Sequence, residues 1–270
     1  MHAHGSCMLI FADSFLELER MLSSRLLALY CATFSTCVML LVTHFVYRYF
    51  VVCRAQDMHH IQGWKLIKLY SFPIFCSILW YVLVVLTMSP SDAKTTYMRD
   101  VMLEEYKVDV EKIGYVGQLY HYHDKDGNLV MCWVDIVAAF VFCGIMQVCI
   151  ITMFICGWKT YWTMQGVRES MSEKTKELNK QLFRTLVLQT LIPLCTMFAP
   201  VGGLIMLPMF SIGVGRLANA PSFCAGFYPA VDAIIIIFMI RDFRNTVLCR
   251  TKKIKPKINS VVPTVLSAES

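Results

Sequence analysis

The stretch WVDIVAAFVFCGIMQVCIITMFICGW, residues 133–158, decides the fold of this chain. Asp135 is its one charged residue, and the stretch is longer than the roughly 20 apolar residues with which a helix crosses the hydrocarbon core of a bilayer. A helix of a soluble core would keep a polar face toward water, and this stretch has none. It therefore predicts a transmembrane helix.

Composition extends that prediction to the whole chain. Of its 270 residues, 57% are hydrophobic and 16% are charged, and the mean hydropathy is +0.55. A soluble domain carries about 25% charged residues. We expect an all-α membrane protein with five spans, at residues 26–53, 64–88, 133–158, 182–210 and 219–240. The fourth span contains Pro193 and Pro200, which predict a kinked helix.

The loops alternate in charge and so predict an orientation. Basic residues outnumber acids in residues 47–68, in residues 159–184 and in the tail from residue 241, whereas acids outnumber basic residues in residues 89–132. Loops rich in Lys and Arg stay in the cytoplasm. We therefore expect residues 1–25 and 89–132 outside the cell, and residues 159–181 and 241–270 in the cytoplasm.

The outer segments leave three questions open. Asp126-Gly127 between apolar runs is typical of a hairpin turn, although residues 89–132 could equally form a solvated acidic connector. His121-Tyr122-His123-Asp124 could ligate a metal, but such a pair of histidines is common by chance, and we expect no metal. Cys7 and Cys132 are the two of the twelve cysteines in the segments expected outside the cell, so a disulfide between them is one possibility.

No catalytic motif appears. The chain has no nucleophile elbow, no HExxH, no P-loop and no dinucleotide-binding glycine motif, so we expect neither an enzyme nor a cofactor nor a nucleic acid partner. Polar residues at membrane depth are expensive and usually functional, and they are the candidate residues here.

Three groups of polar residues each allow two interpretations. Tyr30, Phe34, His44 and Arg48 share one helical face, which is either a path for a signal or an aromatic belt with a snorkelling arginine. Asp232, close to Tyr228 and Pro229, either switches between partners or makes a static hydrogen bond. The cationic stripe Lys176, Lys180 and Arg184 could contact a cytoplasmic partner or anionic membrane lipid.

Three motifs in order carry a family resemblance. His44–Phe50 (HFVYRYF) resembles the inner end of the third helix of the nematode Str family of seven-transmembrane chemoreceptors. Leu178–Pro193 (LNKQLFRTLVLQTLIP) resembles the sixth helix of that family, and Phe227–Arg244 resembles the seventh. The resemblance implies a rhodopsin-like receptor bundle of which this chain holds five helices, with the first two expected to be absent.

The resemblance also implies a function. It implies a chemosensory receptor for a small odorant, coupled to a heterotrimeric G protein, in the plasma membrane of a sensory cilium, with its carboxyl terminus in the cytoplasm. Tyr47-Arg48-Tyr49 would stand where rhodopsin-like receptors carry Asp-Arg-Tyr, although no acid precedes Arg48 here. Tyr228-Pro229 and Asp232 would stand near their Asn-Pro…Tyr motif.

We assign candidate roles on this basis. Ligand contacts are expected at Tyr30, Phe34, Phe223 and Phe227, and bundle movement at His44, Tyr228, Asp232, Pro193 and Pro200. The residues expected to face the G protein are Tyr47, Arg48, Tyr49, Lys176, Lys180, Arg184, Arg241 and Arg244. The rival hypotheses are a non-signalling fragment or partner of full-length receptors, and a transporter or channel, which would need a continuous polar path.

Overall fold

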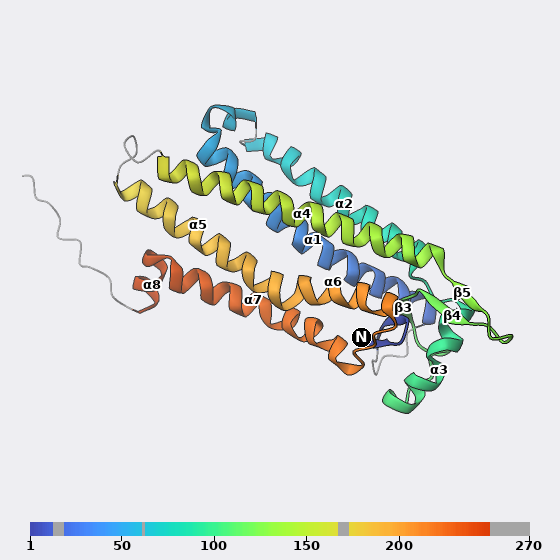
Figure 1. Cartoon of the computed structure of the whole chain (residues 1–270). Helices are drawn as coiled ribbons and strands as arrows, with labels where there is room; N and C mark the ends of the chain where they lie inside the picture. Colours follow the sequence, from blue (N-terminus) through green and yellow to red (C-terminus); the bar gives the residue numbers. More distant parts are fainter. Residues whose placement is uncertain (13–18, 61–62, 167–172, 249–270) are drawn as a thin grey trace, which may run out of the picture.

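Long helices side by side, covered at one end by short strands, make up the structure (Figure 1). The computed structural model of the chain describes residues 1–12, 19–60, 63–166 and 173–248. Within these residues, five helical stretches are long and apolar enough to cross a membrane, at Arg20–Cys53, Gly63–Thr87, Trp133–Gly166, Glu177–Phe210 and Arg216–Met239. The five expected spans therefore exist as helices.

The helices extend beyond the apolar stretches that predicted them. Helix α1 (Arg20–Cys53) begins six residues before the predicted span, and α4 (Trp133–Gly166) ends eight residues after its predicted end. A helix satisfies its own backbone hydrogen bonds and can therefore continue past the hydrocarbon core into water. Hydropathy locates only the part of each helix that lies in lipid. The other long helices are α2 (Ile67–Thr87), α5 (Glu173–Pro193) and α7 (Ala220–Met239).

The fourth span changes its helical type three times. Helix α5 ends at Pro193, a π-helical turn follows at Leu194–Phe198, and α6 (Ala199–Met206) leads into a 3₁₀ turn at Leu207–Phe210. Proline removes one backbone donor, and π-turns mark places where the regular ladder is disturbed. The predicted kink is therefore a real interruption of the helix.

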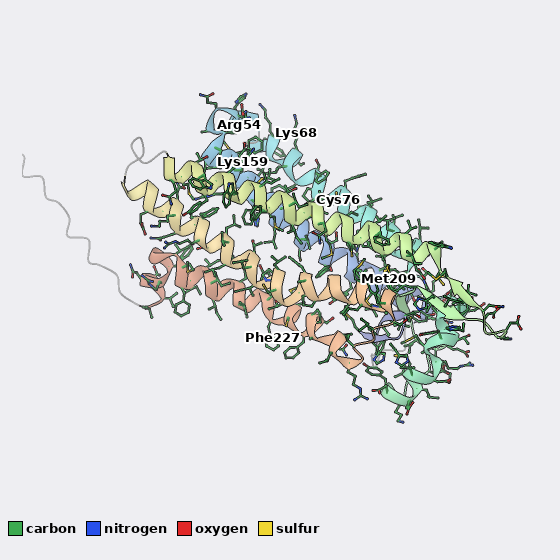
Figure 2. All side chains as sticks on the ribbon, viewed as in Figure 1. Arg54, Lys68, Cys76, Lys159, Met209 and Phe227 are labelled. Atoms are coloured by element: carbon green, nitrogen blue, oxygen red, sulfur yellow. The ribbon has the colours of Figure 1, made fainter. Side chains whose placement is uncertain are left out.

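Helix α1 is the central helix, since it packs against both α2 and α4. Trp80 of α2 packs against Phe142 of α4, with ring centroids 4.6 Å apart and ring planes tilted by 45°. Helices α5 and α7 pack against each other. Large apolar side chains such as Phe72 and Phe75 point outward from α2, as lipid-facing residues do. The basic residues Arg54, Lys68 and Lys159 gather at the end opposite the strands (Figure 2), where the short helix α8 (Arg241–Val247) also lies.

The other end is covered by a structured cap that the sequence did not predict as a whole. Strands β1 (His2–His4), β2 (Cys7–Phe11) and β3 (Tyr115–Leu119) form an antiparallel sheet in that order. Gly117 pairs with Leu9, and a Cβ there would lie only 2.8 Å from the carbonyl oxygen of Met8. The close approach of the two strands therefore requires glycine.

The predicted hairpin is present. Strand β4 (His121–His123) pairs with β5 (Leu129–Met131), and Gly127 adopts a φ of +78° in the turn. His121 Nε2 lies 2.9 Å from the hydroxyl of Ser211. No cluster of metal-ligating side chains occurs among the described residues.

Helix α3 (Asp92–Tyr106) is the second part of the cap that sequence reasoning missed. Ser91 caps its first turn by accepting a hydrogen bond from the backbone of Lys94. Met98 and Met102 lie four residues apart on one face, and both are fully buried with Leu9 in a second apolar cluster. Helix α3 and the three-stranded sheet thus share an apolar core that is separate from the main core of the bundle.

The suggested disulfide is wrong in this structure. Cys7 and Cys132 pack in the same apolar cluster, yet both are free thiols. Cys7 is completely buried, and burial raises the pKa of its thiol to about 12. A thiol in such surroundings acts as a small apolar side chain.

A buried ion pair fastens the cap to the bundle. Lys94 Nζ of α3 lies 3.0 Å from Asp135 Oδ1 of α4 and donates to the carbonyl oxygen of Thr87, the last residue of α2, at 2.9 Å. The second carboxylate oxygen of Asp135 accepts a hydrogen bond from the backbone of Leu119 in β3. Four elements therefore meet at one pair of charges.

We predict that Asp135→Asn destabilises the protein by about 3–5 kcal/mol, because it leaves the Lys94 ammonium buried without a counter-charge. The double variant Lys94→Met with Asp135→Leu should recover most of this loss. Thermal unfolding of the detergent-solubilised chain measures both. Equal stability of Asp135→Asn and the natural protein would contradict the role given to the pair.

His2 makes the cap sensitive to acid. Burial lowers the pKa of His2, helped by the nearby positive charges of His4 and Arg216 and opposed by Glu105. Its Nδ1 lies 3.2 Å from the Tyr106 hydroxyl, and its Nε2 is buried with no partner among the described residues. The folded protein therefore disfavours the protonated imidazole.

Because the folded pKa lies below the unfolded value of about 6.5, the unfolded chain binds the proton more tightly. We predict that the contribution of His2 to the free energy of unfolding is constant above a pH of about 6.5. Below this pH, the free energy of unfolding should fall as the pH is lowered. His2→Gln should flatten this part of the profile. Unfolding temperatures measured from pH 8 to pH 5 test it, and an unchanged slope in His2→Gln would contradict it.

Candidate functional site

An apolar cavity lies under the cap, between the outer ends of the helices. Its volume is about 60 Å³, which is smaller than the about 300–1,000 Å³ typical of small-molecule sites, so a ligand of ordinary size would have to push its walls apart. Helix α1 contributes Tyr30 and Phe34 to its wall, α2 contributes Trp80, and α4 contributes Phe142. None of the described residues that line it has a charged side chain.

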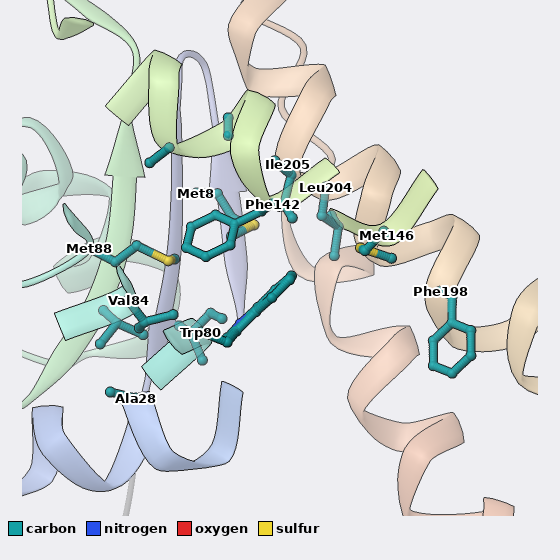
Figure 3. Packing of buried hydrophobic residues seen from close by; sticks show 14 of the residues in the cluster. Met8, Ala28, Trp80, Val84, Met88, Phe142, Met146, Phe198, Leu204 and Ile205 are labelled. Atoms are coloured by element: carbon teal, nitrogen blue, oxygen red, sulfur yellow. The ribbon is translucent and has the colours of Figure 1, made fainter. Parts of the chain in front are cut away.

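The cap and the interrupted span close the cavity. Met8 of β2 reaches the cavity from the cap, and Leu204 and Ile205 reach it from α6 (Figure 3). Trp80 and Phe142 lie between them as the aromatic centre of the main core. The cavity is therefore bounded by the cap and by residues of α1, α2, α4, α6 and α7.

Two of the four expected ligand residues do not reach this cavity. Tyr30 and Phe34 line it, whereas Phe223 and Phe227 of α7 are 69% and 57% exposed. Figure 2 shows Phe227 on the outer side of α7. Neither phenylalanine lines this cavity. The neighbouring positions Ser222 and Ala225 face the cavity instead, because each residue turns the helix by about 100°.

A second site of polar contacts lies where Pro193 ends α5. Proline has no backbone N–H, so the carbonyl of Gln189, four residues earlier, lacks its helical partner. The Tyr228 hydroxyl of α7 donates to this carbonyl at 3.0 Å. Gln189 Nε2 in turn donates to Asp232 Oδ1 at 2.7 Å. The kink in one helix is thereby bonded to the next helix.

The other residues expected in this cluster lie elsewhere. His44 is exposed on α1, Pro229 is exposed on α7, and Pro200 stands at the start of α6. Gln189 was missed by sequence reasoning. A signal existed, since a proline always frees the carbonyl four residues before it, and here that residue also carries an amide.

The opposite end of the bundle holds a third contact, between α1 and α5. Arg48 Nη2 donates to the backbone carbonyl of Asn179 at 2.8 Å and to its side-chain oxygen at 3.0 Å. Lys159 lies over the ring of Tyr49, 5.9 Å from its centroid. In this structure Arg48 therefore holds the end of α5 against α1.

The π-turn links the cavity to the two polar contacts. Phe34 lines the cavity and packs edge-on against Phe198, the last residue of the π-turn, with centroids 5.4 Å apart. From Phe198 the chain leads back through Pro193 and Gln189 to Asn179. One interrupted helix thus touches all three sites.

Comparison with known proteins agrees with this arrangement. The family described as serpentine type 7TM GPCR chemoreceptor Str matches residues 1–248. The chain belongs to the Str family of chemoreceptors. It is thus a multi-pass membrane receptor of the G-protein-coupled class, and the family is one of receptors rather than enzymes.

The chain also matches individual receptors over most of its length. The chain is 35% identical to serpentine receptor class r-10 of Caenorhabditis briggsae and 33% identical to that of Caenorhabditis elegans, over 84% and 83% of its length and 67% of each relative. It is 25% identical to G-protein coupled receptor str-33 of Caenorhabditis elegans, over 83% of its length and 65% of that relative. No solved structure matches the chain.

The remaining candidate residues of this Str receptor lie at the end away from the cap. Tyr47, Lys180, Arg184 and Arg244 are exposed, and Tyr49 is half-buried. The side chains of Lys176 and Arg241 lie outside the described part of the structure.

We predict that Tyr228→Phe costs about 1 kcal/mol of stability, because it leaves the Gln189 carbonyl without a donor. Pro193→Ala supplies a backbone N–H to the same carbonyl, so Tyr228→Phe should cost markedly less in that background. A double-mutant cycle by thermal unfolding measures this coupling. Additive effects of the two substitutions would contradict the shared carbonyl.

Proposed function

We propose that this Str-family receptor detects a small, largely apolar odorant in the cavity under its cap and signals through a heterotrimeric G protein. The observation that carries the proposal is the contact of the cavity wall with the π-turn, through Phe34 and Phe198. A site that only stored an apolar molecule would not need to touch the π-turn of the fourth span.

The proposed signal begins at Phe34. A molecule that fills the cavity presses on Phe34, Leu204 and Ile205, two of which belong to α6. Helix α6 is joined to α5 by the π-turn, which has the least regular hydrogen bonding of this span. Movement is therefore expected to concentrate at Leu194–Phe198, while α5 and α6 each move as a unit.

The movement has a specific cost at each polar contact. If α5 swings outward, Tyr228 loses the Gln189 carbonyl, and Arg48 loses both oxygens of Asn179. The structure thus supports a closed state, and the ligand has to favour the open state by more than these contacts contribute. A ligand shifts such an equilibrium only by its difference in affinity for the two states.

The open state would expose a surface for the G protein. Separation of α5 from α1 would bare Arg48 beside Tyr47 and Tyr49, close to the exposed Lys180 and Arg184. These residues form a cationic surface at the end that we place in the cytoplasm, and anionic lipid would contact its rim. Because the coupling is reciprocal, a bound G protein would raise the affinity for the odorant. We place the receptor in the plasma membrane of a sensory cilium.

We predict that an odorant from a broad volatile panel evokes a G-protein signal in cells that express the full chain. Phe34→Leu should raise the concentration for half-maximal response about tenfold, because part of an aromatic contact with the ligand is lost. Phe227→Leu, the same change on the outer face of α7, should leave it within about twofold. Surface labelling of each variant controls for folding.

Three results would count against this function. Silence across the panel would favour a non-signalling partner of other receptors. A ligand-evoked current without G protein would favour a channel. Equal effects of Phe34→Leu and Phe227→Leu would place the ligand outside the cavity.

A further inference from the structure

A groove lies between α1 and α2, at the end of the bundle that the cap covers (Figure 1). It holds about 380 Å³, and none of its described lining residues also lines the cavity under the cap. Its outer part carries the polar side chains of Arg20, Ser24 and Arg25 from α1. Ala28, which lies about 12 Å further along α1 than Arg20, is apolar, as is Val85 of α2. The groove is therefore polar toward the outside and apolar toward the bilayer interior.

The two arginines of the groove lack a negative partner. No ion pair joins Arg20 or Arg25 to a carboxylate in the part of the chain that the structure describes. Glu19 also lines the groove, but its exposed side chain forms no ion pair with either guanidinium there. Two guanidinium groups beside one groove favour an occupant that carries negative charge.

Arg20 is held in place by the cap. Its Nη2 donates to the Thr95 hydroxyl of α3 at 3.2 Å, and its guanidinium carbon lies 5.7 Å from the centroid of the Tyr115 ring in β3. Its Nε is buried and has no hydrogen-bond partner among the described residues. Every polar atom of a guanidinium is a donor, so turning the group leaves the same need for an acceptor. An arginine that only snorkels to the membrane surface would keep its charged group in water instead.

We infer that this groove binds a phospholipid of the outer leaflet, with its phosphodiester between Arg20 and Arg25 and the start of an acyl chain along Ala28 and Val85. A planar guanidinium donates two parallel hydrogen bonds to a phosphate, so the buried Nε of Arg20 finds its acceptor there. Both arginines lie just outside the span that we expect from residue 26, at the depth of the polar headgroups. The inference depends on this placement in the membrane, and not on the odorant or the G protein.

A lipid in the groove would connect the bundle to the cap. The groove is bounded by α1, by α2 and the segment after it, and by Val116 of β3, while Arg20 also contacts Thr95 of α3. Free phosphate would satisfy the arginines and leave the apolar part of the groove unfilled, whereas a phospholipid matches both parts. The bound lipid should therefore raise the stability of the folded chain.

The test separates the phosphate from the acyl chains. The full chain, purified in a maltoside detergent and a phosphate-free buffer, is titrated with dioctanoyl phosphatidylcholine and with dioctanoylglycerol, which has the same chains and no phosphate. A third titration uses glycerophosphocholine, which has the phosphate and no chains. Thermal unfolding measures binding in each case. We expect the phospholipid to bind at least about tenfold more tightly than dioctanoylglycerol, because hydrogen bonds between charged groups are lost without the phosphate. Glycerophosphocholine at the same concentration should not stabilise the chain.

Two substitutions that each remove one positive charge locate the effect. Arg25 is exposed and has no hydrogen bond or ion pair with the described residues, so Arg25→Gln should fold as the natural chain does. Its affinity for dioctanoyl phosphatidylcholine should fall about tenfold, whereas its affinity for dioctanoylglycerol should not change. Lys125→Gln makes the same change of charge on the exposed turn of the hairpin and should keep the affinity of the natural chain for the phospholipid.

The inference is overturned by any of four results. Equal binding of dioctanoylglycerol and the phospholipid would mean that the groove accepts acyl chains without recognising the phosphate. Equal stabilisation by glycerophosphocholine would mean that the site takes soluble phosphates. Equal phospholipid affinities of Arg25→Gln and Lys125→Gln would place the phosphate outside the groove, and no stabilisation by any of the three compounds would leave the groove without this ligand. None of these results bears on the odorant cavity, because no described residue lines both sites.

Discussion

The constraint on which the rest of this structure depends is that a backbone carbonyl in a bilayer has no water to bond with. Pro193 removes the partner of the Gln189 carbonyl in the middle of a span, and Tyr228 of α7 supplies the replacement. Tyr228 can donate to the Gln189 carbonyl because Pro193 has no backbone N–H to donate to it within the helix. The hydrogen bond at this kink therefore joins α5 to α7 at a defined position along both helices.

The cap depends on a different constraint, which is the burial of charge. Lys94 and Asp135 are each less than a tenth exposed, and neither could stay buried alone. Their partners come from the end of α2, from β3 and from the start of α4. The position of the cap over the bundle is therefore set by four elements at once. The cap supplies Gln118 and Met8 to the cavity wall. The ion pair of Lys94 and Asp135 therefore affects the shape of the cavity through the position of the cap, although neither residue lines the cavity.

The sequence is informative where one residue decides a contact and uninformative where distant segments decide it. Hydropathy located all five spans, and Asp126-Gly127 located the hairpin, since both signals are local. The sheet was missed because Cys7–Phe11 pairs with Tyr115–Leu119, more than a hundred residues away. The positions of Phe223 and Phe227 relative to the cavity could not be predicted for a related reason. A helix that is apolar all round does not reveal which side faces a cavity, so the rotation of α7 depends on packing that one sequence does not state.

The few polar side chains of the cavity wall, Tyr30, Gln118 and Ser222, bear on how a receptor of this kind can be selective. An apolar wall separates two odorants that differ by one methylene by only about 10- to 200-fold, because the pocket loses little when it is partly filled. A buried hydrogen-bonding group discriminates far more strongly, since a ligand without the matching atom leaves that group unpaired. Shape set by Phe34, Trp80 and Phe142 would then choose among molecules of similar polarity, whereas the polar side chains of the wall would choose among chemical classes. A few polar side chains in a mostly apolar wall would therefore separate chemical classes that differ little in shape.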